Sequence, residues 1–202
     1  MRVRGSLSVL ALATLLAARP LAAQEKKAAA PPMDEKAMME LYQKMATPGD
    51  AHQKLGATVG SWNVKNTMWM DPSKPAQVTE GSAESKWILD GRWIEQRYEG
   101  TFMGQPFTGI GYTGYDNYKK KYVSTWMDTA STALFKATGN FDVSGKVLTL
   151  TGKSDDYTTG KEITMREKVT IVSSDEHIFE MWGPAPDGKE YKMMEIRYTR
   201  KK

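Results

Sequence analysis

Residues 92–115 read RWIEQRYEGTFMGQPFTGIGYTGY and contain the pattern that decides the fold. Aromatic and β-branched side chains alternate with polar ones along this stretch, which is typical of strands whose two faces meet different surroundings. The pattern continues from Ser61 to the C-terminus, and no helical periodicity separates the runs. We therefore expect an antiparallel sheet, because parallel strands need long crossover connections.

The strand pattern also predicts how the sheet closes. Turn-forming pairs such as Asp90-Gly91 and Asp187-Gly188 separate the runs. About ten successive strands joined by tight turns predict an all-β, antiparallel up-and-down barrel, since closure removes the exposed edges. A flattened sandwich is the alternative. The expected strands are 61–70, 77–89, 92–103, 106–115, 121–128, 132–141, 146–153, 161–173, 176–183 and 189–199.

One or two short helices are expected before the first strand. Residues 34–45 place Met38, Leu41 and Tyr42 on one helical face, and residues 50–59 form a second candidate. The Met-rich face could dock a partner. We favour a helix that covers a barrel end or lies in solvent.

The N-terminus predicts export. Arg2 and Arg4 precede an apolar run over residues 6–18, and the small residues before Gln24 form a cleavage site near Ala23. The mature protein is then expected to be periplasmic or secreted. The expected organisation is a signal peptide at 1–23, a linker and short amphipathic helix at 24–48 and a β-barrel domain at 49–202.

Charge and composition exclude several partners. Cleavage removes three arginines and no acidic residue, so the formal charge falls from +4 to +1. A near-neutral chain has little long-range attraction for nucleic acid or an anionic membrane. No run in the mature chain is long and apolar enough to span a membrane. The sequence contains no cysteine, which excludes disulfides.

Gly109, Gly111 and Gly114 match the spacing GxGxxG of dinucleotide-binding proteins. That fingerprint needs a helix after the glycines, so that the helix N-terminus meets the pyrophosphate. Here a turn and another strand follow. We therefore interpret the glycines as sites where the strand bends or a neighbour approaches closely.

The sequence points to no catalytic residue, metal or cofactor. It has no GxSxG or SxxK motif, and His52 and His177 are its two histidines. His177 and Glu180 are three residues apart on a predicted strand, so they point to opposite faces and oppose a shared metal. Ten-stranded haem-binding barrels exist, but His177 is expected at a strand end, partly exposed and unligated. Haem binding is therefore not expected.

Mixed aromatic and charged faces predict a ligand cavity. Several strands carry bulky aromatics and charges on one face, which suits a barrel interior where aromatics supply area and polar groups orient a ligand. An outer face with cross-strand ion pairs is the alternative. The candidate interior, ligand-binding residues are Glu95, Arg97, Tyr112, Trp126, Asp128, Glu180, Trp182 and Glu195.

Several phrases together resemble a known family. GSWNV at 60–64, LDGRWIEQ at 89–96 and FMGQPFTG at 102–109 are similar to the bacterial proteins grouped as domain of unknown function 1579. The similarity extends over residues 48–200. It implies an exported, lipocalin-like (calycin-like) β-barrel, and it supplies no activity, substrate, cofactor or functional residue.

Three functions are compatible with these observations. The preferred one is a barrel that binds a small apolar or amphipathic molecule outside the cytoplasm. The second is an enzyme that uses interior carboxylates such as Glu95 or Asp128 as acid–base groups. The third is a ligand-free interaction module with a filled barrel and a Met-rich docking helix.

Overall fold

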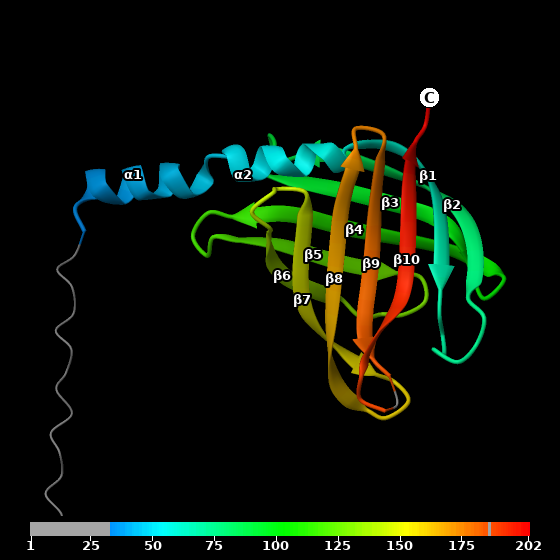
Figure 1. Cartoon of the computed structure of the whole chain (residues 1–202). Helices are drawn as coiled ribbons and strands as arrows, with labels where there is room; N and C mark the ends of the chain where they lie inside the picture. Colours follow the sequence, from blue (N-terminus) through cyan, green and yellow to red (C-terminus); the bar gives the residue numbers. More distant parts are fainter. Residues whose placement is uncertain (1–32, 186) are drawn as a thin grey trace, which may run out of the picture. The chain divides into compact units, whose positions relative to one another are not determined.

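The computed structural model describes residues 33–185 and 187–202, whose strands form a barrel (Figure 1). The predicted signal peptide at 1–23 and the linker up to residue 32 lie outside the described residues. The elements are α1 (Glu35–Ala46), α2 (Asp50–Gln53), the 3-10 helix η1 (Lys54–Thr58), β1 (Gly60–Met68), β2 (Gln77–Ile88), β3 (Trp93–Phe102), β4 (Gln105–Asp116), β5 (Lys121–Asp128), β6 (Phe135–Phe141), β7 (Val147–Asp156), β8 (Lys161–Ser173), β9 (Glu176–Pro184) and β10 (Glu190–Arg200).

The sheet is a closed antiparallel barrel in which each strand pairs with the next along the chain. Strand β10 returns to β1, where Arg200 lies opposite Trp62 and Met194 opposite Met68. Closure leaves no strand with a free row of backbone donors and acceptors. The predicted up-and-down barrel of ten strands is thus confirmed, and the sandwich alternative is wrong.

Alternation along the strands separates the interior from the solvent. On β1, Trp62, Val64 and Asn66 are buried, while Ser61 and Asn63 are exposed. The interior side chains pack as two clusters, one around Leu150 and the other around Trp62. The core therefore lies inside the barrel, as period-two burial requires.

Strand β1 is preceded by α2 and η1, which cover one end of the barrel. Leu55 of η1 is buried in the cluster that contains Ile94 and Tyr122. The Tyr122 hydroxyl donates to the Ala51 carbonyl at 2.9 Å, and the Trp62 indole N–H donates to the Thr58 carbonyl at 3.1 Å. These bonds hold the covering segment in place. The predicted second helix is present, and its second half is the 3-10 helix η1.

Helix α1 has no buried residue. Its C-terminal end is held by Asn117 of the β4–β5 turn, whose side-chain amide donates to the carbonyls of Met45 at 3.0 Å and Thr47 at 2.8 Å. The predicted apolar face is open to solvent, with Met38, Leu41 and Tyr42 all exposed. None of the described helices has the length and apolar character needed to cross a bilayer.

Candidate functional site

The barrel encloses a cavity of about 340 Å³. All ten strands contribute to its wall, and Leu55 and Thr58 of η1 contribute at the covered end. Most wall side chains are apolar or aromatic, including Phe107, Phe179 and Ile196. A small, mostly apolar cavity of this kind is the usual form of a small-molecule site.

Glu167 is the most unusual group in this wall. It lies in the middle of β8, opposite Leu150 on β7 and Met181 on β9, and only 3 % of it is exposed. Within the described part of the chain, its Oε2 atom has no hydrogen-bond partner. Burial raises the pKa of this carboxyl to about 7, because the charged form loses its hydration. Glu167 is therefore partly protonated at neutral pH.

His177 lies in the same wall, near the covered end. Its ring is stacked on Tyr198, with centroids 4.3 Å apart, and meets the edge of Trp62 at 4.4 Å. Burial, assisted by the Arg200 charge, lowers the pKa of His177 to about 4. The ring is therefore neutral at physiological pH, and its Nδ1 has no hydrogen-bond partner among the described residues.

The structure corrects the expected exposure of His177. The residue is near the start of β9, as predicted, but it is 3 % exposed because it points inward, where Trp62 and Tyr198 enclose it. The reason given for expecting no haem therefore fails. The absence of tight haem binding stays a prediction.

Asn66 and Tyr98 add two more unpaired polar atoms. The Tyr98 hydroxyl and the Asn66 side chain are buried near each other, and among residues 33–185 and 187–202 neither the hydroxyl nor the Asn66 Oδ1 atom has a well-formed hydrogen bond. The hydroxyl lies close to Gly100, where a Cβ atom would come within 2.6 Å of it. Burial raises the pKa of Tyr98, and hydrogen bonding from the nearby Asn66 side chain offsets part of this rise, so the phenol stays neutral.

Trp126 and Asp128 form a bonded pair on β5. The indole N–H donates to the Asp128 Oδ2 atom at 2.8 Å, and the Oδ1 atom accepts from the Ala130 N–H at 2.9 Å. The ring lies against Gly109 and Gly111, where a Cβ would approach it to 2.1 and 3.0 Å. The interpretation of these glycines as close-approach positions is confirmed.

Two of the eight predicted interior residues, Trp126 and Asp128, line the cavity. Whether they touch a ligand stays a prediction. The other six do not line the cavity, and the expected interior position is wrong for Glu95, Arg97, Tyr112, Glu180, Trp182 and Glu195.

Three of these six meet on the outer face of β3 and β4. Glu95 accepts from the Arg97 Nε atom at 3.0 Å and from the Tyr112 hydroxyl at 3.3 Å. The Arg97 side chain is 55 % exposed, whereas Ile94 and Tyr98 of the same strand are buried. The charged face of β3 lies outside because the interior offers no comparable pairing for both charges.

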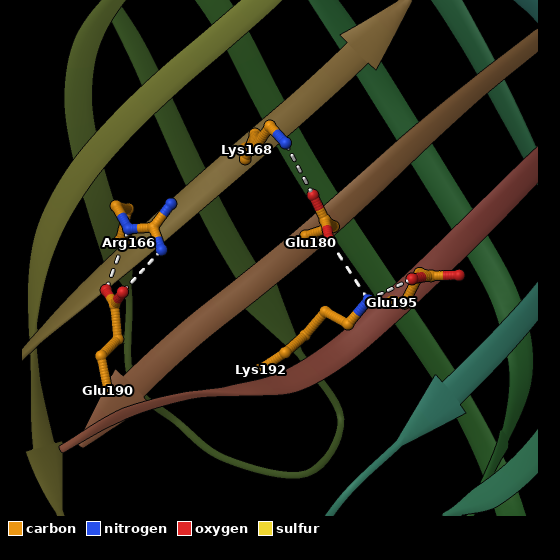
Figure 2. A network of polar contacts seen from close by, with 6 residues as sticks. All are labelled: Arg166, Lys168, Glu180, Glu190, Lys192 and Glu195. Carbon is orange, nitrogen blue, oxygen red and sulfur yellow. Dashed lines mark hydrogen bonds and ion pairs between the residues drawn. The ribbon is translucent and has the colours of Figure 1, made fainter. Parts of the chain in front are cut away.

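The other three lie on the outer face of β9 and β10, and Figure 2 shows two of them, Glu180 and Glu195, with their cationic partners. The Lys192 ammonium contacts Glu195 and lies 3.2 Å from Glu180, which also pairs with Lys168 at 3.2 Å. The Arg166 guanidinium carbon lies over the Trp182 ring, 4.8 Å from the ring centroid. The inward positions of these strands are taken by His177, Phe179, Met181, Met194 and Ile196.

Replacing Arg97 with alanine tests this orientation. We expect an unfolding free energy close to that of wild type, because Arg97 is exposed and Glu95 keeps Lys86, 3.7 Å away, and Tyr112 as partners. Urea denaturation measures the change, with Ile94→Ala as an inward-facing control that should lose about 2–5 kcal/mol. Equal losses in the two variants would contradict the assignment of faces.

Sequence reasoning missed Glu167, His177, Tyr98 and Asn66 as cavity residues. One signal was available for Glu167. Within the predicted strand 161–173, Met165, Glu167, Val169 and Ile171 share one face, so a single acid interrupts an apolar row. No three His, Asp or Glu side chains of the described chain are grouped to hold a metal ion.

Comparison with known proteins identifies a family and a fold. The family model described as "Protein of unknown function (DUF1579)" matches residues 47–200. Among curated proteins, the chain has no significant match. The crystal structure of Rv2717c from M. tuberculosis is similar, with a TM-score of 0.57 and 15 % identity over 77 % of this chain and 100 % of that one.

Two further solved structures are more distant. The S-type phycobiliprotein lyase CPES from Guillardia theta gives a TM-score of 0.47 at 13 % identity, over 77 % of this chain and 99 % of that one. The redesigned beta barrel mFAP1, bound to DFHBI, gives 0.38 at 19 % identity, over 75 % of this chain and 100 % of that one. The likeness to Rv2717c shows a shared barrel fold.

Proposed function

We propose that the barrel binds a small apolar or amphipathic molecule in its interior cavity. The chain belongs to the DUF1579 family of proteins of unknown function. The observation that carries this proposal is a mostly apolar cavity whose wall also holds unpaired polar atoms. The volume of about 340 Å³ falls within the range of small-molecule sites, about 300–1,000 Å³.

The unpaired atoms favour a bound ligand over an empty barrel. A buried polar group without a partner costs about 1–3 kcal/mol, and four residues of the cavity wall carry such an atom. A ligand with a polar head and an apolar body would offer hydrogen bonds to these polar residues and fill the apolar space. The cavity also argues against an interaction module with a filled barrel.

The enzyme alternative loses its two named candidates. Glu95 lies on the outer face, and both oxygens of Asp128 already accept hydrogen bonds. Glu95 therefore lies away from a substrate in the cavity, and the Asp128 carboxylate is held by two N–H donors of its own strand and the following turn. Glu167 is an interior carboxyl, but its Oε2 atom has no acid–base partner among the described residues, so ligand binding is the better supported function.

Native mass spectrometry of the purified protein tests the proposal. We expect a stoichiometric small-molecule adduct that is lost on denaturation. Ser124→Leu should reduce it, because Ser124 lines the cavity and a larger side chain takes ligand space. Thr149→Leu is the matched control, since Thr149 lies between the inward-facing Leu148 and Leu150 and does not line the cavity. A bare chain that also fails to bind added 1-octanol would overturn the proposal.

We also propose that the barrel works after export, in the periplasm or outside the cell. The support is the basic start, apolar run and small-residue cleavage site within residues 1–23. The expected mature N-terminus is Gln24 or a residue within a few positions of it. Intact-mass measurement of the protein from the cell-envelope fraction checks this, and an uncut Met1 on exported protein would contradict it.

A further inference from the structure

The charge balance of the cavity wall restricts the ligand. Of the described residues, two wall side chains carry a carboxyl, Asp128 and Glu167, and none is a lysine or arginine. Both oxygens of Asp128 are engaged by the Trp126 and Ala130 N–H groups. Glu167 is thus a buried acid with an unpaired oxygen and no cation beside it in the wall.

The other unpaired atoms are mostly acceptors. Asn66 contributes Oδ1, Glu167 contributes Oε2 and the neutral His177 contributes Nδ1, while the Tyr98 hydroxyl can donate or accept. Unpaired acceptors are complemented by a ligand group that donates. A primary ammonium group offers three donors and no acceptor, which suits this wall better than a hydroxyl or a carboxylate does.

The aromatic side chains favour a cation as well. Tyr98 and Trp126 line the cavity, and the face of an aromatic ring attracts a desolvated ammonium group. A ligand carboxylate would instead meet Glu167 with no wall cation to neutralise either charge. His177 adds no opposing positive charge, because its burial keeps the ring neutral.

We infer that the ligand is an apolar primary amine whose ammonium group pairs with Glu167 while its hydrocarbon part fills the cavity. This inference rests on the proposed ligand-binding function and names the chemical class of the ligand. The amine enters protonated, and Glu167 receives it as a carboxylate, so the charges of the two groups cancel inside the barrel. Glu167 has already lost its hydration in the folded barrel, so pairing with the ammonium group offsets a cost that folding imposes on its charged form.

Three probes of equal chain length test the inference: octylamine, 1-octanol and octanoate. Isothermal titration calorimetry at pH 8 compares them on wild type, Glu167→Gln and Glu162→Gln. Glu162 lies on the same strand, but it is exposed and pairs with Lys153 at 2.9 Å, so it serves as the matched control. We expect wild type to bind octylamine at least about tenfold tighter than 1-octanol, and octanoate most weakly.

The variants locate the preference. Glu167→Gln should lose the tenfold advantage of octylamine and keep its affinity for 1-octanol, whereas Glu162→Gln should match wild type. Equal or tighter binding of 1-octanol by wild type would overturn the amine assignment and leave the ligand-binding function standing. Failure of all three probes, without any co-purified adduct, would overturn both. The ranking on wild type decides the question even if Glu167→Gln does not fold.

Discussion

Replacing Glu167 with glutamine should stabilise the ligand-free barrel by about 3 kcal/mol at pH 8. Burial raises the pKa of Glu167 from 4.5 to about 7 in the folded protein. Between these two values the folded state binds more protons than the unfolded state, so stability falls as the pH rises through this window. Above pH 7 the cost of the buried charge is fully present. Glutamine has the shape of the neutral acid and never ionises.

His177 has the opposite effect on stability. Its pKa falls from 6.5 to about 4 on folding, so the unfolded state binds more protons between these values. Stability is then lost as the pH falls from 6.5 towards 4. The two contributions oppose each other between pH 4.5 and 6.5 and leave the wild-type profile flat there. Tyr98 and Tyr198, the other titratable groups near Glu167, stay neutral because burial raises their pKa values.

Chemical denaturation across pH 4 to 8 measures these effects on protein refolded without small molecules. In Glu167→Gln, stability should rise with pH between 4 and 6.5, because the His177 contribution is no longer masked. Glu162→Gln should keep the flat wild-type profile, since its carboxylate is exposed. A Glu167→Gln profile parallel to wild type, with no gain at pH 8, would show that Glu167 is solvated in the folded state.

The strand pattern was enough to predict the barrel. Each of the ten expected strands overlaps an observed one, and their ends agree to within a few residues, as with 161–173 for β8 and 176–183 for β9. Alternating side chains and turn pairs are local signals in the sequence. Strands joined by tight turns pair antiparallel, because parallel strands need long crossover connections. The pairing of β10 with β1 was predicted because it removes the two exposed edges of the sheet, and no single residue indicated it.

The sequence did not decide which face of each strand lines the barrel. On β5 the aromatic and polar face around Trp126 does point inward, but on β3 the face with Glu95 and Arg97 points outward. Both faces of β3 carry bulky side chains, so aromatic content does not separate them. In β3, β9 and β10 the face with fewer charges is inside, because outside charges keep their hydration and their cross-strand partners.

Glu167 shows why the main site residue was missed. It stands between Arg166 and Lys168, and three consecutive charges look like a solvated segment. The structure separates them: Arg166 and Lys168 point outward to Glu190 and Glu180, and Glu167 points inward. Only the face of the strand distinguishes the three, and a long-range property such as an unpaired buried oxygen has no counterpart in local sequence.

Gly109→Ala should lower the unfolding free energy by about 1–3 kcal/mol and reduce ligand binding in the cavity. A Cβ at this position would lie 2.1 Å from the Trp126 ring, which is far below van der Waals contact. The ring cannot swing away freely, because its N–H is bonded to the Asp128 carboxylate at 2.8 Å. The variant must therefore break this bond or push the indole further into the cavity, and either change alters the wall at the ligand.

Urea denaturation and 1-octanol titration together distinguish a local change from general unfolding. Gly56→Ala is the matched control, because a Cβ there would meet Trp87 at an ordinary 3.9 Å and should leave stability and binding nearly unchanged. In the double variant Gly109→Ala/Trp126→Leu the clash is absent. The alanine should therefore cause no further loss of stability relative to Trp126→Leu alone. Additive losses in the double variant would mean that the two residues do not touch, and the close packing of Trp126 on β4 would be wrong.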